Sequence, residues 1–152
     1  MTQKLKMGTI PLILVVIPSY KHTHLIGRTL QSIVDQSYES WEEIVVDNHF
    51  PDQADQVVQS FSDPIIKLLK THNNGLIAAS RNIGIGEAKG EWIAYVDSGD
   101  CWTSNKLQEC MDTKRDLDLL VGLWDSEIAS LESVVGHKVC YTVAADSCNA
   151  FL

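Results

Sequence analysis

The stretch EWIAYVDSGD, residues 91–100, decides the fold of this chain. Its first half is apolar and aromatic, and it ends abruptly in the carboxylates of Asp97 and Asp100. A buried strand with acidic side chains at its C-terminal end is typical of α/β proteins that hold a metal-bound phosphate at the edge of a parallel sheet. Gly99 interrupts the cluster, because a second carboxylate two residues after Asp97 would point the same way from an extended backbone.

Apolar runs and helical repeats alternate along the rest of the chain. A continuous apolar, β-branched run at residues 12–17, closed by Pro18, predicts a strand that is covered on both faces. Mostly apolar segments at residues 44–46, 65–69 and 92–96 predict three further strands. Apolar residues at helical spacing predict helices over residues 24–36, after a cap at Asp52, over residues 76–89 and after a cap at Thr103. Gly90, directly after a lysine, predicts the end of the third helix. The alternation predicts an α/β fold with a Rossmann-like, mostly parallel sheet and helices on both faces.

The length and composition indicate one domain. A chain of 152 residues with 45% hydrophobic content can bury one core. We expect residues 1–10 to form an N-terminal tail and residues 11–116 to form the α/β domain. Residues 117–124 are compatible with a further strand, and periodicity is weak from residue 126 onward. We expect residues 117–152 to be a divergent or truncated segment that packs on the same domain.

Charge and cysteine content narrow the class of partner and the compartment. A net charge of -8 argues against non-specific attraction to nucleic acid or to anionic lipid. A phosphorylated ligand would therefore need local donors or a cation. The four cysteines show neither a C-x-x-C pair nor zinc-finger spacing, so we expect reduced thiols in a cytoplasmic protein. The apolar run at residues 10–17 is far too short to span a bilayer, which takes roughly 20 apolar residues.

Polar residues gather at the ends of the predicted strands, where ligands bind in open parallel sheets. Tyr20, after the first strand, offers a flat face for a base, and Asp47, after the second, can accept a hydrogen bond from a base or ribose. Taken singly, Tyr20 is more often half-buried packing and Asp47 more often a turn cap. Arg81 has no acidic neighbour four residues away in its predicted helix, which favours a contact elsewhere, such as a phosphate. A solvated surface arginine is the alternative.

Other familiar motifs fail. The sequence GIGEAKG, residues 84–90, resembles a dinucleotide fingerprint, but its last glycine is one residue late and it leads from a helix into a strand. This counts against a Rossmann-like oxidoreductase. The histidines show no metal-ligand spacing, and we expect them in loops or on the surface.

Taken together, these pieces resemble the nucleotide-sugar-binding half of a family 2 glycosyltransferase with the GT-A fold. The similar text covers roughly residues 11–107, in order and at the spacing of that family. No single piece is decisive, but the series is highly specific. It consists of VVIPSYK (15–21), LQSIVDQSY (30–38), EIVVD (43–47), NG (74–75), AASRNIG (78–84), AKGE (88–91) and YVDSGD (95–100).

The resemblance implies an activity and a site. It implies transfer of a sugar from a nucleotide-diphosphate donor, a UDP-sugar first of all, to a saccharide or lipid-linked acceptor. It implies that Asp97 opens a D-x-D motif that binds Mg²⁺ or Mn²⁺, with Asp100 as the second carboxylate, and that the cation neutralises charge on the departing diphosphate. The residues that it assigns to nucleotide binding are Pro18, Ser19, Tyr20, Asp47, Arg81 and Asp97.

Two departures from the family pattern support an alternative, a truncated and weak or inactive donor-binding module that acts with a partner. Gly99 removes the carboxylate expected to be the principal metal ligand. None of the downstream carboxylates lies in a stretch of sequence similar to that around the family's catalytic base, so we assign no base. These carboxylates are Asp125, Glu127, Glu132 and Asp146. A partner protein or a second copy would then cover the open side of the sheet, and a lipid-linked acceptor leaves peripheral membrane association open.

Overall fold

The structure is a computed structural model of the whole chain, and it describes residues 12–48, 53–61 and 66–113 together with three short strands further on. Side chains are described as far as residue 112. The predicted N-terminal tail, residues 1–10, lies outside the described residues, as do Asp52 and most of residues 117–152. The division of the chain at residues 10 and 116 therefore stays a prediction.

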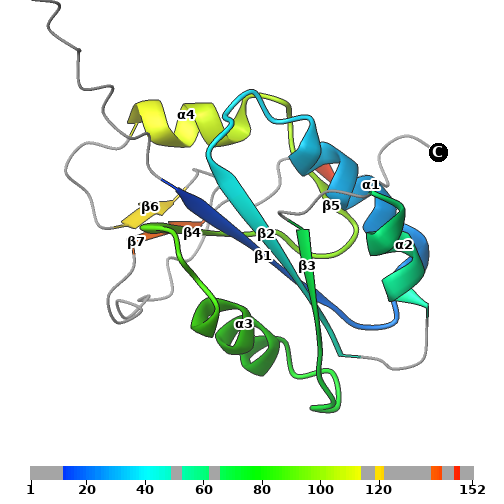
Figure 1. Cartoon of the computed structure of the whole chain (residues 1–152). Coiled ribbons are helices and arrows are strands. Elements are labelled where there is room, and N and C mark those ends of the chain that lie inside the picture. The colour runs from blue at the N-terminus through cyan, green and yellow to red at the C-terminus, as the bar shows by residue number, and fades with distance from the viewer. Residues whose placement is uncertain are drawn as a thin grey trace, which may run out of the picture.

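The chain folds around a six-stranded sheet of order β3-β2-β1-β4-β7-β6, in which every described pair of neighbouring strands is parallel (Figure 1). A separate antiparallel pair joins β5 to β8. The fold prediction is confirmed. The strands are β1 (Ile13–Ser19), β2 (Trp41–Asp47), β3 (Ile66–Lys70), β4 (Trp92–Tyr95), β5 (Asp100–Cys101), β6 (Leu119–Val121), β7 (Lys138–Tyr141) and β8 (Asp146–Ser147). The helices are α1 (Thr23–Val34), α2 (Ala54–Ser60), α3 (Ile77–Gly86) and α4 (Lys106–Thr113).

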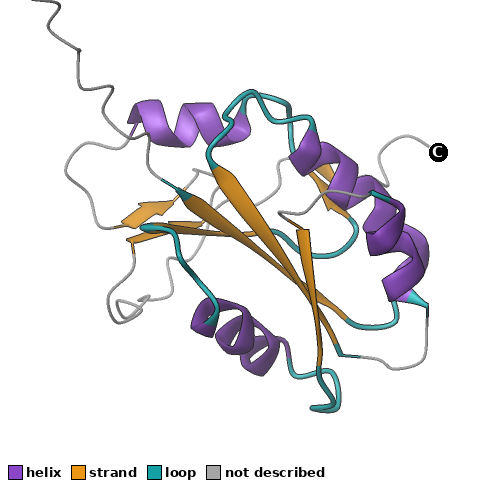
Figure 2. Cartoon of the chain, in the orientation of Figure 1, coloured by secondary structure: helices purple, strands orange, loops and turns teal. Residues whose placement is uncertain are grey.

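The helices cover both faces of the sheet, with α3 on one face and α1, α2 and α4 on the other (Figure 2). The alternation of side chains along β1 divides the core accordingly. Ile13, Val15 and Ile17 pack in the cluster that contains the α1 and α4 side chains, whereas Leu14 and Val16 pack in the cluster that contains Ile85 of α3. All five β1 residues are fully buried, which explains the continuous apolar run in the sequence.

The order of the strands reverses beside β1. The chain builds β2 and β3 on one side of β1 and then crosses over to place β4 on the other side. Pairing of β1 with β4 ends at Val16 and Tyr95, whereas pairing with β2 continues to Ser19. Pro18 therefore lies within β1 rather than closing it. The backbone of Pro18 points toward the β4 side, as that of Val16 does, but proline has no N–H to donate to β4. Strands β1 and β4 can therefore part after Val16 and leave a crevice.

Helix α3 ends earlier than predicted. It stops at Gly86, and the residues after it turn toward β2, where the Glu42 carboxylate accepts hydrogen bonds from the N–H groups of Lys89 (2.9 Å) and Gly90 (3.2 Å). The backbone of Gly90 lies very close to the start of β1. A Cβ at this position would lie only 2.5 Å from the carbonyl oxygen of Leu12. The prediction that Gly90 stops the helix is wrong. This glycine instead lets the turn pass close to a strand.

Two further predictions are refined. The N-cap position of α2 is Gln53, in a left-handed conformation and without a side-chain hydrogen bond, so Asp52 precedes that position. Strand β6 lies within the segment predicted as a strand at 117–124. Strand β7 enters the sheet between β4 and β6, although weak periodicity gave no strand prediction there. Its place depends on pairing with β4, a long-range interaction.

The prediction of four reduced thiols is wrong for Cys101, which forms a disulfide bond, and right for Cys110, which is a buried free thiol. The side chains of Cys140 and Cys148 lie outside the described residues. The reason for the error is a long-range pairing. Strand β5 lies antiparallel to β8, which brings Cys101 beside Asp146 near the end of the chain.

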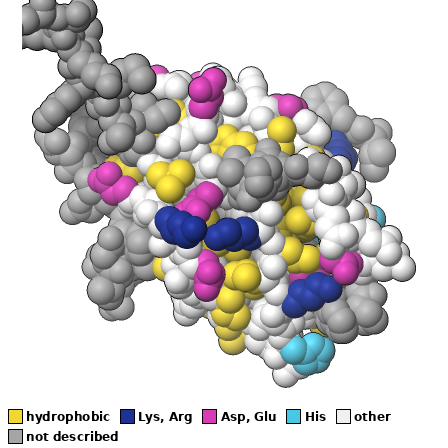
Figure 3. Space-filling model, viewed as in Figure 1, with side chains coloured by type: hydrophobic (Ala, Val, Ile, Leu, Met, Phe, Trp, Pro, Cys, Tyr) yellow, Lys and Arg dark blue, Asp and Glu magenta, His cyan; other side chains and the backbone are white. Residues whose placement is uncertain are grey.

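The surface agrees with the acidic composition. On the viewed face, the described Lys and Arg side chains lie beside Asp and Glu side chains and form no continuous basic surface (Figure 3). Among the described residues, every helix is too short or too polar to cross a bilayer.

Candidate functional site

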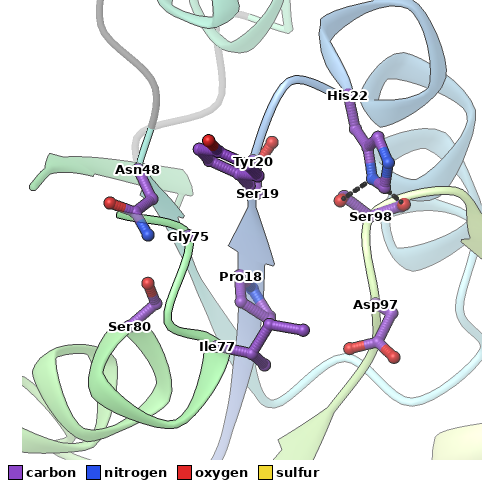
Figure 4. Close-up of a pocket in the computed structure, with 10 residues that line it drawn as sticks. All are labelled: Pro18, Ser19, Tyr20, His22, Asn48, Gly75, Ile77, Ser80, Asp97 and Ser98. Carbon is purple, nitrogen blue, oxygen red and sulfur yellow. Dashed lines mark hydrogen bonds between the residues drawn. The ribbon is translucent and has the colours of Figure 1, made fainter. Parts of the chain in front are cut away.

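A pocket with a cavity volume of about 130 Å³ opens at the carboxyl ends of β1 and β4, where the strand order reverses. Open α/β sheets bind their ligands at this position. Three segments build its walls: the end of β1, the loops after β2 and β3 with the start of α3, and the end of β4 (Figure 4). The lining residues are Pro18, Ser19, Tyr20, His22, Asn48, Gly75, Ile77, Ser80, Asp97 and Ser98.

The end of β1 forms the centre of the pocket. Ser19 is only 1% exposed, and its hydroxyl has no hydrogen-bond partner among the described residues. Tyr20 is 38% exposed and packs against the backbone of Gly75, where an added Cβ would lie 2.9 Å from the ring. Gly75 has a φ of +77°, which favours glycine. The wall therefore offers a buried hydroxyl and a partly exposed aromatic ring to a ligand.

The opposite wall is built by asparagines. The side-chain oxygen of Asn48, which is buried after β2, accepts a hydrogen bond from the N–H of Asn73 (2.8 Å), and the two side chains also bond to each other. Asn73 in turn accepts from the N–H of Leu76 (3.0 Å) and donates to the hydroxyl of Ser80 (3.3 Å). These bonds fasten the loop before α3 to the end of β2. The wall is thus fixed by hydrogen bonds within the protein itself.

Arg81 and Asp97 meet at the third wall. The guanidinium of Arg81 donates from Nη2 to Oδ1 of Asp97 at 2.9 Å, and its carbon lies 5.2 Å from the centre of the Tyr95 ring. Both contacts belong to the end of β4, next to the pocket. The prediction that Arg81 makes a contact outside its own helix is confirmed, and the partner in this structure is the first carboxylate of the D-x-D-like motif.

Asp97 and Asp100 fit a divalent cation only as a minimal pair. Burial raises the pKa of the Asp100 carboxyl above its ordinary value of 3.8, and the negative charge of Asp97 raises it further, so the carboxylates lie within electrostatic reach of each other. Gly99 adds no ligand, and the described residues contain no group of three or more metal-binding side chains. Mg²⁺ is commonly held by one or two carboxylates together with substrate phosphates and water. Asp97 and Asp100 can supply the carboxylates of such a site.

Asp47, which we predicted to bind the nucleotide, is buried below the pocket lining. It ends β2 opposite Ser19 of β1 and is only 2% exposed, so the pocket wall at this point is formed by its neighbour Asn48. Of the predicted nucleotide-binding residues, four line the pocket directly: Pro18, Ser19, Tyr20 and Asp97. Arg81 reaches the site through Asp97, and Asp47 lies beneath it.

His22, which we expected in a loop or on the surface, belongs to the pocket as well. The residue is exposed, but its ring lines the pocket and its Nδ1 lies 3.0 Å from the carbonyl oxygen and 2.9 Å from the hydroxyl of Ser98 (Figure 4). The only local signal is its position two residues after Tyr20, in the loop that follows β1. Its partner is 76 residues away and could not be identified from spacing.

Comparison with known proteins places the chain in a family. A family model described as "Glycosyl transferase family 2" matches residues 14–132. The chain is similar to the Escherichia coli protein "UDP-Glc:alpha-D-GlcNAc-diphosphoundecaprenol beta-1,3-glucosyltransferase WfgD", with 33% identity over 90% of this chain and 56% of the relative.

Solved structures show the same fold. TarS from S. aureus, residues 1–349, superposes with a TM-score of 0.67 and 25% identity over 80% of this chain and 38% of TarS. TarS has also been solved in complex with UDP and with UDP-GlcNAc. The mannosyltransferase PcManGT from Pyrobaculum calidifontis, in complex with GDP-Man and Mn²⁺, has a TM-score of 0.55 and 27% identity over 60% of this chain and 28% of its own.

The chain spans about half the length of WfgD and less of the other proteins, so the similarity concerns the part of them that this chain covers. Within that part, the matched residues include all of β1 except Ile13, the whole of β2, β3 and β4, and every lining residue of the pocket. The family model thus matches well over half of the chain, and the chain belongs to glycosyltransferase family 2.

Proposed function

We propose that this chain is the donor-binding part of a glycosyltransferase that transfers a sugar from a nucleotide-diphosphate donor to a saccharide or lipid-linked acceptor. A UDP-sugar is the donor that we expect. One observation carries the proposal: four predicted nucleotide-binding residues line a single pocket at the point where strand order reverses, and a fifth contacts one of them. The relatives that are named for UDP-Glc or solved with UDP-GlcNAc support this class of donor.

We assign a role to each side chain from its chemistry. The hydroxyl of Ser19, buried and without a described partner, would gain one from a nucleotide. Tyr20 would pack its exposed ring area against the base or ribose, and Asp47 would accept a hydrogen bond from a base N–H. Arg81 would turn its guanidinium toward the diphosphate, for which its planar set of donors is well suited.

A divalent cation, Mg²⁺ or Mn²⁺, completes the proposal. Asp97 and Asp100 would hold it, with the remaining ligands supplied by the diphosphate and water. When bound, the cation would stabilise the negative charge that develops on the departing diphosphate. The complex of PcManGT with Mn²⁺ supports this assignment for a relative of the same fold. Because Gly99 removes one carboxylate, we expect the affinity for the metal to be low.

The acceptor, the compartment and any association stay predictions. We place the protein in the cytoplasm, where nucleotide sugars would be available to it. A second copy or a partner protein that covers the open side of the sheet, and a peripheral contact with a membrane that carries a lipid-linked acceptor, are each consistent with an enzyme of this class.

Isothermal titration calorimetry tests the proposal. We expect UDP and UDP-sugars to bind more tightly than ADP, and more tightly with Mn²⁺ than without it. Asp47→Asn should reduce the preference for UDP, whereas Asp112→Asn, an exposed carboxylate on α4 that bonds to Gln108, should not. Absence of binding to any nucleotide sugar, with or without metal, would disprove the proposal. Binding without transfer or donor hydrolysis would favour the donor-binding module.

A further inference from the structure

Helix α1 and the residues at its two ends carry polar side chains that hydrogen-bond to the backbone of the segment after Asp97. The hydroxyl of Thr29 accepts from the N–H of Gly99 (2.9 Å), and that of Ser32 accepts from the N–H of Trp102 (3.2 Å). Gln36 donates to the carbonyl of residue 103 (2.7 Å) and accepts from the N–H of residue 107 (2.9 Å). We call this set, with His22, the α1 polar stripe. It fastens residues 98–107 along the length of the helix.

His22 forms the end of this stripe that faces the pocket. Thr29, Ser32 and Gln36 are buried, whereas His22 is exposed and lines the cavity. His22 occupies the N-cap position of α1, and its carbonyl accepts from the N–H groups of Leu25 and Ile26. Its side chain makes no capping hydrogen bond, although short polar residues at this position usually do. The ring reaches across to Ser98 instead.

The His22 ring can bond to Ser98 in two ways. A carbonyl oxygen only accepts hydrogen bonds, so a protonated Nδ1 of His22 donates to the Ser98 carbonyl, whereas an unprotonated Nδ1 accepts from the Ser98 hydroxyl; either tautomer joins the ring to Ser98. The bond holds Ser98, and Ser98 is the residue that follows Asp97. On the other side of Ser98, the Gly99 N–H is held by Thr29, and the α1 side chain of Leu25 lies 3.1 Å from the position of a Gly99 Cβ. The first turns of α1 thus fix the backbone on which Asp97 is mounted.

We propose that His22 is a positioning residue of the donor site, which holds Ser98 so that the Asp97 carboxylate faces the pocket before the donor arrives. This inference rests on the proposed function. His22 is suited to the role because it is the one described member of the stripe at the pocket. Removal of the His22 side chain would release Ser98, next to Asp97, and would leave the buried hydrogen bonds of Thr29, Ser32 and Gln36 in place.

The test compares three substitutions that keep or lose the hydrogen bond that Nδ1 makes. In His22→Asn the amide nitrogen is attached to Cγ, as Nδ1 is, so the variant can still donate to Ser98. In His22→Gln the nitrogen is one bond further out, and His22→Ala has no donor. His72→Ala is the matched control, because His72 is exposed and does not line the pocket. The readouts are the dissociation constant for UDP with Mn²⁺, the melting temperature, and amide exchange of residues 98–101.

We expect His22→Ala and His22→Gln to weaken UDP binding about 3- to 10-fold, as for one hydrogen bond, and to speed amide exchange at residues 98–101. His22→Asn should stay within about twofold of the wild type, and His72→Ala should be unchanged. Equal weakening by all three substitutions, with lower melting temperatures, would show a merely structural role and overturn the proposal. So would an unchanged affinity in His22→Ala. A wild-type chain that binds no UDP would instead refute the proposed function, and the positioning role with it.

Discussion

Arg81 donates a hydrogen bond to Asp97 across the gap between α3 and the end of β4, at 2.9 Å. The Asp97 side chain is 57% exposed, so the pair contributes less than about 1 kcal/mol to folding. The pair matters for ligand binding, because the guanidinium hydrogen-bonds to the carboxylate that we expect to bind the divalent cation. A divalent cation bound by Asp97 would compete with Arg81 for this carboxylate. A diphosphate would relieve the competition by drawing the guanidinium away.

Arg81→Ala should therefore act in opposite directions on the two ligands. We expect UDP to bind about 10- to 100-fold more weakly, the loss typical of a hydrogen bond to a charged group. Mn²⁺ added without nucleotide should bind more tightly, because Asp97 loses its positive neighbour. Calorimetry measures both affinities. Arg28→Ala, which removes an exposed arginine from α1, is the charge-matched control and should alter neither. Weaker binding of Mn²⁺ to Arg81→Ala would contradict the competition.

Gly99 permits a test of the missing carboxylate. Its φ is +116°, and a Cβ there would lie 3.1 Å from Cδ1 of Leu25, so Gly99→Ala and Gly99→Asp should each lose about 1–3 kcal/mol of folding stability. Only Gly99→Asp adds a metal ligand. We expect the two variants to melt alike, and Mn²⁺-dependent UDP affinity to be higher in Gly99→Asp than in Gly99→Ala. Equal affinities would mean that the Asp97 and Asp100 pair already supplies every side-chain ligand the cation uses.

Helix α3 provides a matched pair of glycines. A Cβ at Gly84 would lie 2.6 Å from Cγ1 of Val16, whereas nothing lies within 4 Å of one at Gly86. Gly84→Ala should therefore push α3 from the sheet and cost about 1–3 kcal/mol of unfolding free energy. Gly86→Ala should be neutral or stabilise by at most about 1 kcal/mol. Urea denaturation measures both values. Similar stabilities of the two variants would show that α3 does not rest on β1 at Gly84.

The raised pKa of Asp100 predicts how stability varies with pH. Its pKa lies above 3.8 in the folded protein because of burial and the charge of Asp97, so the folded state holds the proton more tightly than the unfolded state. Below the pKa of Asp100 in the unfolded state, both states carry the protonated carboxyl and the free energy of unfolding is unaffected by its charge. As pH rises through the higher pKa of Asp100 in the folded state, the carboxyl ionises and the protein loses stability. Asp100→Asn should match the wild type near pH 3 and melt at a higher temperature near pH 7.

Thermal unfolding across this range measures the difference, and saturating Mn²⁺ should reduce it in the wild type, since a cation offsets the charge. Asp35→Asn, an exposed carboxylate after α1 that bonds to Gln31, controls for the general loss of a negative charge. A higher melting temperature for Asp100→Asn at low pH as well would mean that the carboxyl destabilises through packing rather than through charge.

Much of the lining of the pocket could be predicted because strand ends are visible in sequence. Ser19, Tyr20 and Asp97 each follow an apolar run, and the carboxyl ends of parallel strands meet at one edge of the sheet. The pairing of Arg81 with Asp97 could be anticipated only in part. The lack of an acidic neighbour on its helix excluded a local partner, but the identity of the partner depended on where α3 crosses the sheet.

The errors share one physical cause. Gly90 has the sequence context of a helix stop, yet its backbone is needed for a close approach to Leu12, far away along the chain. Cys101 bears no spacing signal for a disulfide, yet β5 lies against β8. His22 is exposed, as expected, but its contact with Ser98 had no signal in the sequence. In each case the deciding contact joins segments whose proximity depends on the packed sheet.

Local patterns along the chain were therefore sufficient for the α/β class, the faces of β1 and the residues that end each strand, because periodicity and turn chemistry act within a few neighbouring residues. The order β3-β2-β1-β4, the parting of β1 from β4 after Val16 and the hold of His22 on Ser98 arose at the level of the assembled fold. They depend on which distant surfaces pack together, and no short stretch of sequence encodes that choice.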